Sequence, residues 1–479
     1  MRKQVLFLLA RQLCKDAFRS KVMLLASLLI LFLLLFSAYT SWENYHNQNH
    51  TRSSIQQEDR SSWENNPDKH PHRMAHYGSF ALRQKHPLST FDLGMENFVG
   101  NAVFLEAHKQ NTVNFSEASM STGLLRFGEV SLAMLLKVIL PLLIFYLGFA
   151  SIAKERENGT LKLLIGQGIT RKEIVAGKWL GLWSLSLIYV FSIFLVVLFF
   201  ILTTNHHNLQ SDSLLRYGIL LIAYLLFFGI ISGVTILVSA FSPRANDALV
   251  KLLGIWLLFV IIMPKSLQAI GYYMYPTPSK IEMETAVEHD LKTLGDSHNP
   301  DDPHFKAVKD SILLANNVKK VDELPFNYSG FIMAEGERLS TSVYIDHQNR
   351  LYDVYTKQNN IERYSAFFNP YTAIKNLSMA FSGTDFQSFL HFKSKAETYR
   401  FKLAQDMNQL QMDLIPNKGK KGPSKISNAY WKEFPPFNYD FMTLSNVFKN
   451  ELISLLALGL WSILVTLGLY RLANNLKAI

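Results

Sequence analysis

Six long apolar runs constrain the fold of this chain more than any other feature of its sequence. Each approaches or exceeds the roughly 20 residues that cross the hydrocarbon core of a bilayer. The runs lie at 22–39, about 130–153, 179–203, 219–241, about 252–273, and 452–470. Because a spanning segment must satisfy its backbone hydrogen bonds internally, each run predicts a membrane helix.

Two large polar inserts separate some of these runs, which is why the mean hydropathy is only +0.08. We expect an all-α polytopic membrane protein with six transmembrane helices and a mainly helical extracytoplasmic domain formed by the two inserts. The predicted segments are an amphipathic interfacial helix at 1–21, the first span at 22–40, insert one at 41–129, spans two to five at 130–273 with a loop at 154–178, insert two at 274–451, and the sixth span with its tail at 452–479.

Within the inserts, the patterning differs along the chain. Residues 43–69 are polar and predict a loose segment, whereas 76–115 gain aromatic residues and glycines and predict a packed one. Residues 334–364 and 388–412 keep apolar residues at helical spacing and predict a helical hairpin.

The distribution of charge predicts the orientation. The segments at 1–21 and 154–178 and the C-terminal tail are net positive, whereas both inserts are net negative, although the whole chain carries +10. Since positive loops stay on the cytoplasmic side, both termini and the 154–178 loop are expected to be cytoplasmic and both inserts outside. The excess basicity thus reflects topology, and we expect no nucleic-acid partner.

The N-terminal segment has a basic stripe. Arg11, Lys15 and Arg19 recur every four residues, while Leu9, Leu13 and other apolar residues lie mostly away from them. This pattern is typical of a helix lying flat in the membrane interface. The alternative is a simple cytoplasmic anchor that orients the first span.

The loop between the second and third runs is charged and rich in glycine: ERENGTLKLLIGQGITRKEIVAGKWLG, residues 155–181. Glu155 and Glu157 suit the first turn of a helix, where acidic side chains favour the helix dipole. Leu161 and Leu164 supply an apolar face to that helix. Gly166 and Gly168 would then end this helix and reverse the chain.

A second helix is predicted to begin directly afterwards. Thr170 and Glu173 have the spacing of a capping box, which starts a helix that continues into the third span. The pattern is compatible with a short helix parallel to the membrane that meets a soluble partner, and equally with a plain connector between two spans.

The same loop is similar to the signature of ABC-2-type transporter permeases, in which an acidic pair, Gly-Thr-Leu and a later Arg/Lys-Lys-Glu-Ile…Gly-Lys recur between the second and third spans. The resemblance implies a coupling helix that docks on a separate ATP-binding subunit, and a second permease chain, identical or different, that completes a dimer. The positions that match the signature are Glu155, Glu157, Gly159, Thr160, Leu161, Arg171, Lys172, Gly177 and Lys178. Arg156 and Leu164 lie in the same loop and are expected to take part in ATPase coupling with Glu155, Glu157, Gly159, Thr160, Leu161, Arg171 and Lys172.

Two stretches of the inserts also carry a resemblance. One is HPHRMAHYGSFALRQKHPLSTFDLGMENFVGNAVFLEAHKQN at 70–111, and the other runs from Asn369-Pro370 through LSMAFSGTDFQSFLHFKSKAETYR to Arg400. Both are similar to a bacterial subfamily of these permeases with a large extracytoplasmic domain of unknown function. The resemblance implies a bacterial cytoplasmic (inner) membrane and leaves the substrate open.

The chain lacks the phosphate-binding pattern GxxxxGK[ST]. Gly177 and Lys178 are followed by Trp179, and no glycine stands five residues before Gly177. ATP and Mg are therefore expected on the partner subunit, with no cofactor in this chain. HExxH and GxSxG motifs are also absent, and we expect no enzyme activity of its own.

A few polar residues stand apart as weak candidates. His70, His72 and His76 offer imidazoles to copper or zinc, with a structural or solvent-facing role as the favoured alternative. Lys137 and Lys265 lie within apolar runs, where charges often mark pathways; snorkelling to the surface is the favoured alternative.

The loop and its resemblance to ABC-2-type permeases together imply a permease that exports a substrate when a separate subunit hydrolyses ATP. One alternative is that movement passes to the extracytoplasmic domain, which acts on an outer partner protein without substrate passage. Another is a membrane scaffold or sensor that works without an ATPase.

Overall fold

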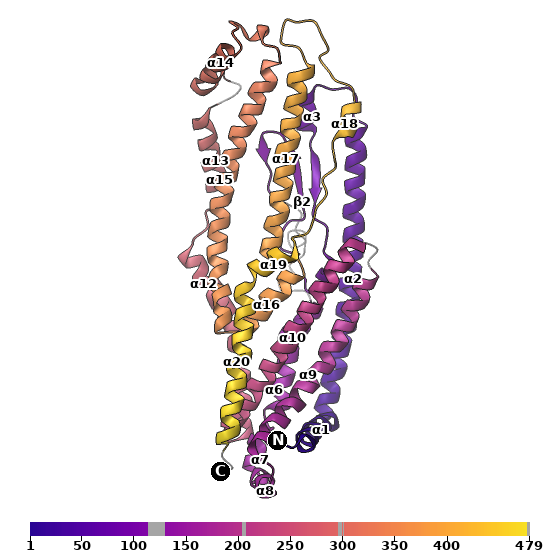
Figure 1. Cartoon of the computed structure of the whole chain (residues 1–479), viewed down its shortest axis with the longest axis vertical. Coiled ribbons are helices and arrows are strands. Elements are labelled where there is room, and N and C mark those ends of the chain that lie inside the picture. The colour runs from indigo at the N-terminus through magenta and orange to yellow at the C-terminus, as the bar shows by residue number, and fades with distance from the viewer. Residues whose placement is uncertain (114–129, 204–206, 296–298, 300, 477–479) are drawn as a thin grey trace.

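The computed structural model describes residues 1–113, 130–203, 207–295, 299 and 301–476 of the chain. Among these residues, six helices are long and apolar enough to cross a membrane. They form one end of an elongated molecule, at which both chain termini lie (Figure 1). We call this the proximal end. The opposite end is the distal domain, residues 43–113 and 276–443. The expected all-α polytopic fold is confirmed.

The spans correspond closely to the apolar runs. They are α2 (Lys21–Glu64), the segment Leu132–Glu157, α9 (Arg171–Leu202), α10 (His207–Phe241), the segment Ala245–Met274, and α20 (Leu452–Asn475). The segment Leu132–Glu157 comprises α5 (Leu132–Met134), η3 (Leu135–Ile139), α6 (Leu140–Gly148) and α7 (Ala153–Glu157). The segment Ala245–Met274 comprises α11 (Ala245–Leu257), η4 (Leu258–Ile262) and α12 (Met263–Met274).

The second and fifth spans each contain a π-helical stretch, η3 and η4. Each stretch is followed at once by a proline in the next turn, Pro141 in α6 and Pro264 in α12. Proline lacks the backbone N–H and clashes with the carbonyl one turn before it. The wider π turn accommodates that proline without breaking the span.

The first span extends far beyond the bilayer, because α2 is one continuous helix of 44 residues. The expectation of a loose segment at 43–69 is therefore wrong for most of its length. No glycine or proline interrupts 21–64, and Tyr45, Arg52 and Trp63 are buried. These three residues are about two and three turns apart, so they lie on one face of the helix. Packing of that face inside the distal domain holds the polar half of α2.

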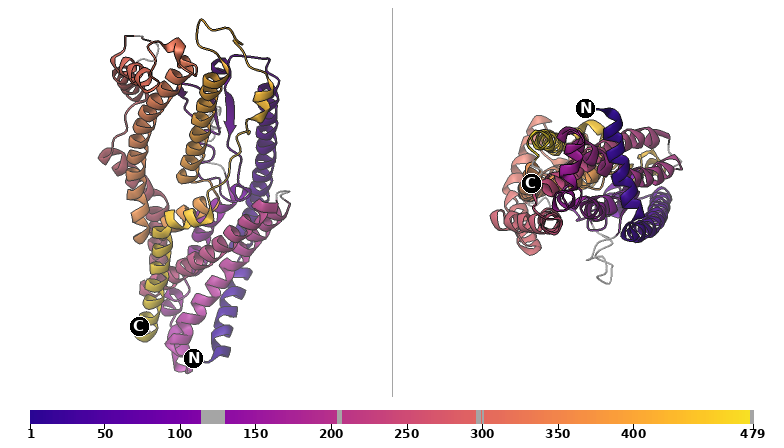
Figure 2. Two further views of the ribbon diagram at one scale, coloured as in Figure 1. Left: turned by 45° about the horizontal axis from the view of Figure 1, so that its top comes forward. Right: turned by 90° about the horizontal axis from the view of Figure 1, so that it is seen from below.

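The N-terminal helix α1 (Lys3–Arg19) crosses the base of the spans, as seen from below in Figure 2. Leu9 and Leu13 are buried against α9 rather than facing lipid. The contact is close because α9 presents glycine there: a Cβ on Gly181 would lie 2.9 Å from the carbonyl oxygen of Ala10. Phe18 lies outside this buried face and is exposed.

The distal domain is mainly helical. Its elements are α3 (Pro71–Tyr77), β1 (Ser79–Leu82), η1 (Pro87–Thr90), β2 (Ala102–Glu106), β3 (Lys109–Gln110), α13 (Lys280–Leu294), α14 (Pro303–Ala315), η5 (Val321–Glu323), α15 (Tyr328–Tyr364), η6 (Ser365–Phe367), α16 (Pro370–Phe381), α17 (Phe386–Leu414) and α18 (Ala429–Glu433), with α19 (Leu444–Asn450) leading back to the last span. The expected hairpin is present as α15 and α17, which pack on each other, with α16 between them in sequence.

A small sheet was not foreseen. Strands β1, β2 and β3 pair antiparallel in that order, with Phe80 opposite Phe104 and Leu105 opposite Gln110. The part of the segment 76–115 that extends past residue 113 lies outside the described residues.

The two inserts are joined by shared hydrophobic clusters, the larger of which lies at the end of α2. Trp63 from insert one and Trp431 from insert two are both buried in that larger cluster, together with Met74 and Met407. The indole N–H of Trp63 also donates to the carbonyl of Trp431 at 3.0 Å. These contacts join the end of α2 to α18.

Candidate functional site

The segment singled out by the sequence lies at the proximal end, opposite the distal domain (Figure 1). We define residues 153–172 as the proximal loop. It contains α7 and α8 (Thr160–Gly166) and leads into α9. The sequence predicted one helix here, but Gly159 adopts a left-handed conformation, φ +74°, and divides it. The expected reversal after Gly166 is present, with Gly168 at φ +81°.

The start of α7 is fixed to the span α10 by a single hydroxyl. Ser239 Oγ accepts from the backbone N–H groups of Ile152 and Ala153 at 3.0 and 3.1 Å, and donates to the carbonyl of Phe149 at 2.7 Å. Backbone donors at a helix start lack intrahelical acceptors, and here a side chain from another span supplies one.

The charged residues of α7 contact the ends of neighbouring spans. Arg156 donates to the carbonyls of Ala240 and Ser242, at 2.6 and 3.0 Å, where α10 ends. A cation is favourable there because the last carbonyls of a helix are unsatisfied and carry partial negative charge. Glu157 accepts from the backbone N–H of Ala245, 3.3 Å away, where α11 begins.

Glu155 forms an ion pair with Lys178 of α9. Both side chains are largely buried. The structure thus places Glu155, Arg156 and Glu157 in contacts within this chain, to α9, α10 and α11 respectively. Lys178 matched the family signature, but its role as the partner of Glu155 could not be read from the sequence.

The short helix α8 has an inner and an outer side. Leu161 is fully buried and Leu164 packs against the core of the spans. Leu163, by contrast, is 66% exposed. Lys162 and Gln167 are exposed as well. Thr160 closes the bend by donating to the carbonyl of Glu155 at 3.1 Å.

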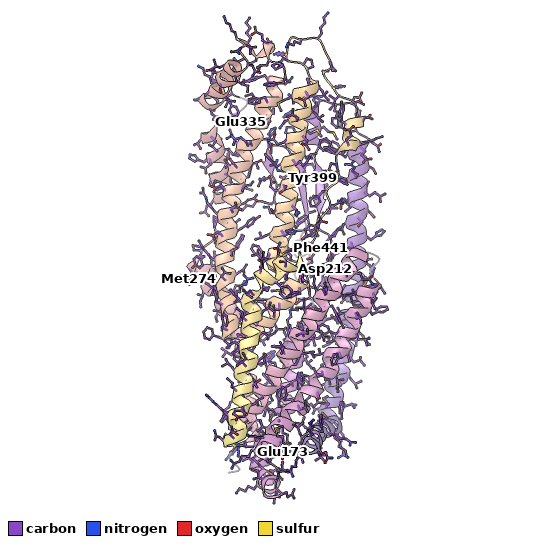
Figure 3. All side chains as sticks on the ribbon, in the orientation of Figure 1. Glu173, Asp212, Met274, Glu335, Tyr399 and Phe441 are labelled. Atoms are coloured by element: carbon purple, nitrogen blue, oxygen red, sulfur yellow. The ribbon has the colours of Figure 1, made fainter. Side chains whose placement is uncertain are left out.

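The expected capping box at the start of α9 is present between Thr170 and Glu173. Arg2 completes it, because its backbone N–H and guanidinium both donate to the Glu173 carboxylate, at 2.6 to 3.1 Å. Arg2 also donates to the carbonyl of Gly168 at 2.7 Å. The chain start is therefore tied to the end of the proximal loop, and Glu173 marks this place at the base of Figure 3.

Arg171 and Lys172 face the last span. Arg171 donates to the carbonyl of Asn474 at 3.4 Å, and the Lys172 ammonium lies 5.4 Å from the centre of the Tyr470 ring. Both side chains remain exposed, so a partner protein can still reach them.

The two intramembrane lysines lie in different settings. Lys137 is buried and its Nζ lies 2.5 Å from Asp92 Oδ2, so its charge is paired inside the protein. Asp92 comes from the segment after η1, which packs into the spans through Phe91. Lys265, in α12, is exposed. A pathway role for either residue stays a prediction.

The three histidines proposed from sequence do not form one group. His70 is the N-cap of α3 and accepts from the backbone N–H of His72 at 3.3 Å. His72 and His76 instead gather with His108, from the turn between β2 and β3. Sequence reasoning missed His108 because it is remote from the other two along the chain.

A buried ion pair holds the same turn. Arg400 Nη1 donates to Glu337 Oε1 at 2.6 Å and to the carbonyl of Glu106 at 3.1 Å. Burial raises the pKa of Glu337, but hydrogen bonds and charge from His108 and Arg400 outweigh it and lower that pKa to about 2. The carboxylate is therefore ionised at neutral pH.

Comparisons with known proteins agree with this architecture. Residues 96–277 match the family model described as ABC-2 family transporter protein. Residues 280–440, most of the second insert, match a model described as a domain of unknown function (DUF3526). A search of curated proteins gave no match. Residues 96–277 are therefore similar to ABC-2 family transporter proteins, and residues 280–440 match, in addition, a domain of unknown function.

Proposed function

We propose that this chain is the membrane permease subunit of an ATP-binding cassette transporter and that its proximal loop couples ATP hydrolysis in a separate subunit to movement of the spans. The match of residues 96–277 to the ABC-2 family model supports the permease role. The coupling role is supported chiefly by one observation: α8 is anchored to the spans on one side and exposed on the other.

The contacts between α7 and the spans are suited to transmitting a displacement of the proximal loop. Glu155 pairs with Lys178 of α9, Arg156 binds the end of α10, and Glu157 meets the start of α11. Three spans are thus bound by three consecutive residues. A partner that pushes on α8 would move all three together, because packed interiors transmit strain rather than absorb it.

The outer side supplies the docking surface. Leu163 is an exposed apolar side chain flanked by the exposed Lys162 and Gln167. An apolar centre with a polar rim is the usual composition of a protein interface. Burying one leucine contributes about 1.5–3 kcal/mol, which corresponds to about a tenfold to hundredfold change in affinity.

Leu163→Asn tests this surface in complexes purified with the ATP-binding subunit. We expect weaker association by about tenfold to a hundredfold and loss of permease-stimulated ATP hydrolysis, with unchanged thermal stability of the permease alone. Leu314→Asn is the matched control, since Leu314 is also highly exposed but lies on α14 in the distal domain. Equal effects of the two variants, or none from Leu163→Asn, would contradict the proposal.

The remaining components follow from the same proposal. ATP and Mg bind the partner subunit, a second permease chain completes the membrane dimer, and substrate leaves the cell through it. The proximal loop and both termini lie on the cytoplasmic side of a bacterial inner membrane. The net positive charge of the proximal segments supports this orientation.

The length of α2 favours a second candidate, transmission of movement to an extracytoplasmic partner without substrate passage. At about 1.5 Å per residue the helix is about 66 Å long, roughly twice the hydrocarbon thickness. It contacts α1 near the proximal end and finishes with Trp63 in the distal core. A rigid element of this kind can carry a displacement from one end of the molecule to the other.

A further inference from the structure

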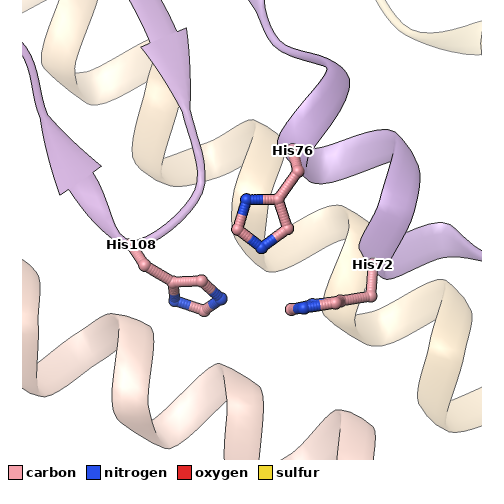
Figure 4. Close-up of side chains that lie close together, drawn as sticks. All are labelled: His72, His76 and His108. Carbon is pink, nitrogen blue, oxygen red and sulfur yellow. The ribbon is translucent and has the colours of Figure 1, made fainter.

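Three imidazole rings converge in the distal domain, far from the proximal loop. His72 and His76 come from α3, and His108 comes from the turn between β2 and β3 (Figure 4). One nitrogen from each ring lies within 4.8 Å of the others. Imidazole is the side chain that zinc and copper(II) bind most readily among nitrogen donors.

Local structure explains why the first two rings are neighbours. His72 and His76 are four residues apart on α3, and that spacing puts them on one face, one turn apart. The hairpin is held against the same helix, because the backbone N–H of Ala107 donates to the carbonyl of Ala75 at 3.2 Å. The main chain therefore brings His108 to the two helical rings.

His108 is held in a defined tautomer. Glu337 Oε2 accepts from its backbone N–H at 2.7 Å and lies 3.1 Å from its ring Nδ1. An ionised carboxylate can only accept, so Nδ1 carries a proton toward Glu337, and in the neutral imidazole Nε2 then carries the lone pair. Nε2 is buried and has no hydrogen-bond partner among the described residues.

Glu337 is fixed in turn from its other side. It is fully buried, and its Oε1 accepts from Arg400 at 2.6 Å and from Thr341 at 3.1 Å. A carboxylate that orients a histidine through Nδ1 while Nε2 points to the other rings is the arrangement found behind metal-binding histidines.

We propose that His72, His76 and His108 bind a zinc ion and that Glu337 is the positioning residue for His108. Three protein ligands leave the fourth tetrahedral position to water. Zinc–nitrogen bonds of about 2.0–2.1 Å put ligand nitrogens about 3.3 Å apart, so the ring nitrogens, now within 4.8 Å of one another, must close by up to about 1.5 Å. His76 is exposed and His72 half-exposed, which leaves room for that rotation.

The site can be reached from solvent. A pocket of about 250 Å³ opens beside His108 and is lined also by Phe305, Gly336 and Leu339. His76 is itself exposed, so an ion can reach the cluster from solvent. This proposal is independent of the coupling role of the proximal loop.

The test is titration of the purified full-length protein, stripped with a chelator, with zinc sulfate alone. We expect one zinc ion per chain and, by X-ray absorption, three imidazole nitrogens at about 2.0–2.1 Å. No zinc binding, or zinc bound without imidazoles, would overturn the proposal. Copper(II) bound at these rings without zinc would overturn the choice of metal.

Two substitutions make the assignment specific. His108 has φ +63°, a conformation that asparagine tolerates, so His108→Asn removes the ring without straining the turn. We expect at least about 100-fold weaker zinc binding, more than the loss of an outer-shell partner gives. His70→Asn is the control, because asparagine keeps the N-cap of α3. Equal zinc affinity in the two variants would refute the site.

Glu337→Gln tests the positioning role. Glutamine still accepts from the His108 backbone but no longer enforces the tautomer, and we expect about 10- to 100-fold weaker zinc binding by the folded protein. If Glu337 served only the fold, zinc affinity of the folded fraction would stay at the wild-type value, and the positioning role would be wrong.

Discussion

Charged residues of the proximal loop contact the spans of this chain, so they are not free to bind only a partner protein. Arg156 lies within hydrogen-bonding distance of two carbonyls at the end of α10, and Glu155 pairs with Lys178. A charge reversal at these positions would therefore loosen the loop from its own spans. Leu163 is the better probe of a docked partner, since its side chain points away from this chain.

The buried pair of Glu337 and Arg400 allows a prediction at the same scale. Arg400→Gln leaves a carboxylate buried without its cation, which costs about 3–5 kcal/mol. We expect a marked loss of thermal stability of the distal domain. Lys402→Gln, on the same helix, is the control: its pair with Asp406 is exposed, and such pairs contribute about 0–1 kcal/mol. Comparable melting temperatures for both variants would argue against a buried, ionised Glu337.

Some residue-level contacts could be predicted because they are local. Thr170 and Glu173 are three positions apart, and a capping box is defined by that spacing. Arg2 and His108 could not be predicted, because their partners Glu173 and Glu337 are remote in sequence and the chain fold alone brings them together.

Secondary-structure elements could be predicted from the sequence where an apolar run determines them. The six apolar runs became six spans because a helix is the one way for a single segment to satisfy its backbone in lipid. The polar half of α2 was missed for the complementary reason: its helix is stabilised by tertiary packing of Tyr45, Arg52 and Trp63 rather than by an apolar run. The short sheet was missed because its strands are brief and bounded by turns.

Transmission along α2 can be tested in the part of the helix that lies within the distal domain. Ser54 is exposed, so Ser54→Pro removes no buried contact but breaks the helix at a cost of about 3 kcal/mol. If α2 carries movement, the variant should lose any ATP-dependent change in protease sensitivity of the distal domain while the complex still hydrolyses ATP. Ser54→Ala should behave as wild type, and a proline variant that retains the ATP-dependent change would exclude α2 as the lever.

The whole molecule has two chemically distinct ends. Both termini, α1 and the proximal loop share one end, and the insert helices and the histidine cluster share the other (Figures 1 and 2). Charge patterning predicted this segregation, since net positive segments alternate with net negative inserts. It could not predict how the inserts fold together, which depends on contacts such as Trp63 with Trp431.

This separation makes the central claim directly measurable. The chain has one cysteine, Cys14, so a Cys14→Ser background allows single cysteines at positions 163 and 314. Each can carry a photo-activated crosslinker in native membranes, and the products can be identified by mass spectrometry. Position 163 should crosslink to a subunit that contains a GxxxxGK[ST] loop, and position 314 should not. Crosslinking of that subunit at 314, or none at 163, would contradict the proposed coupling role of the proximal loop.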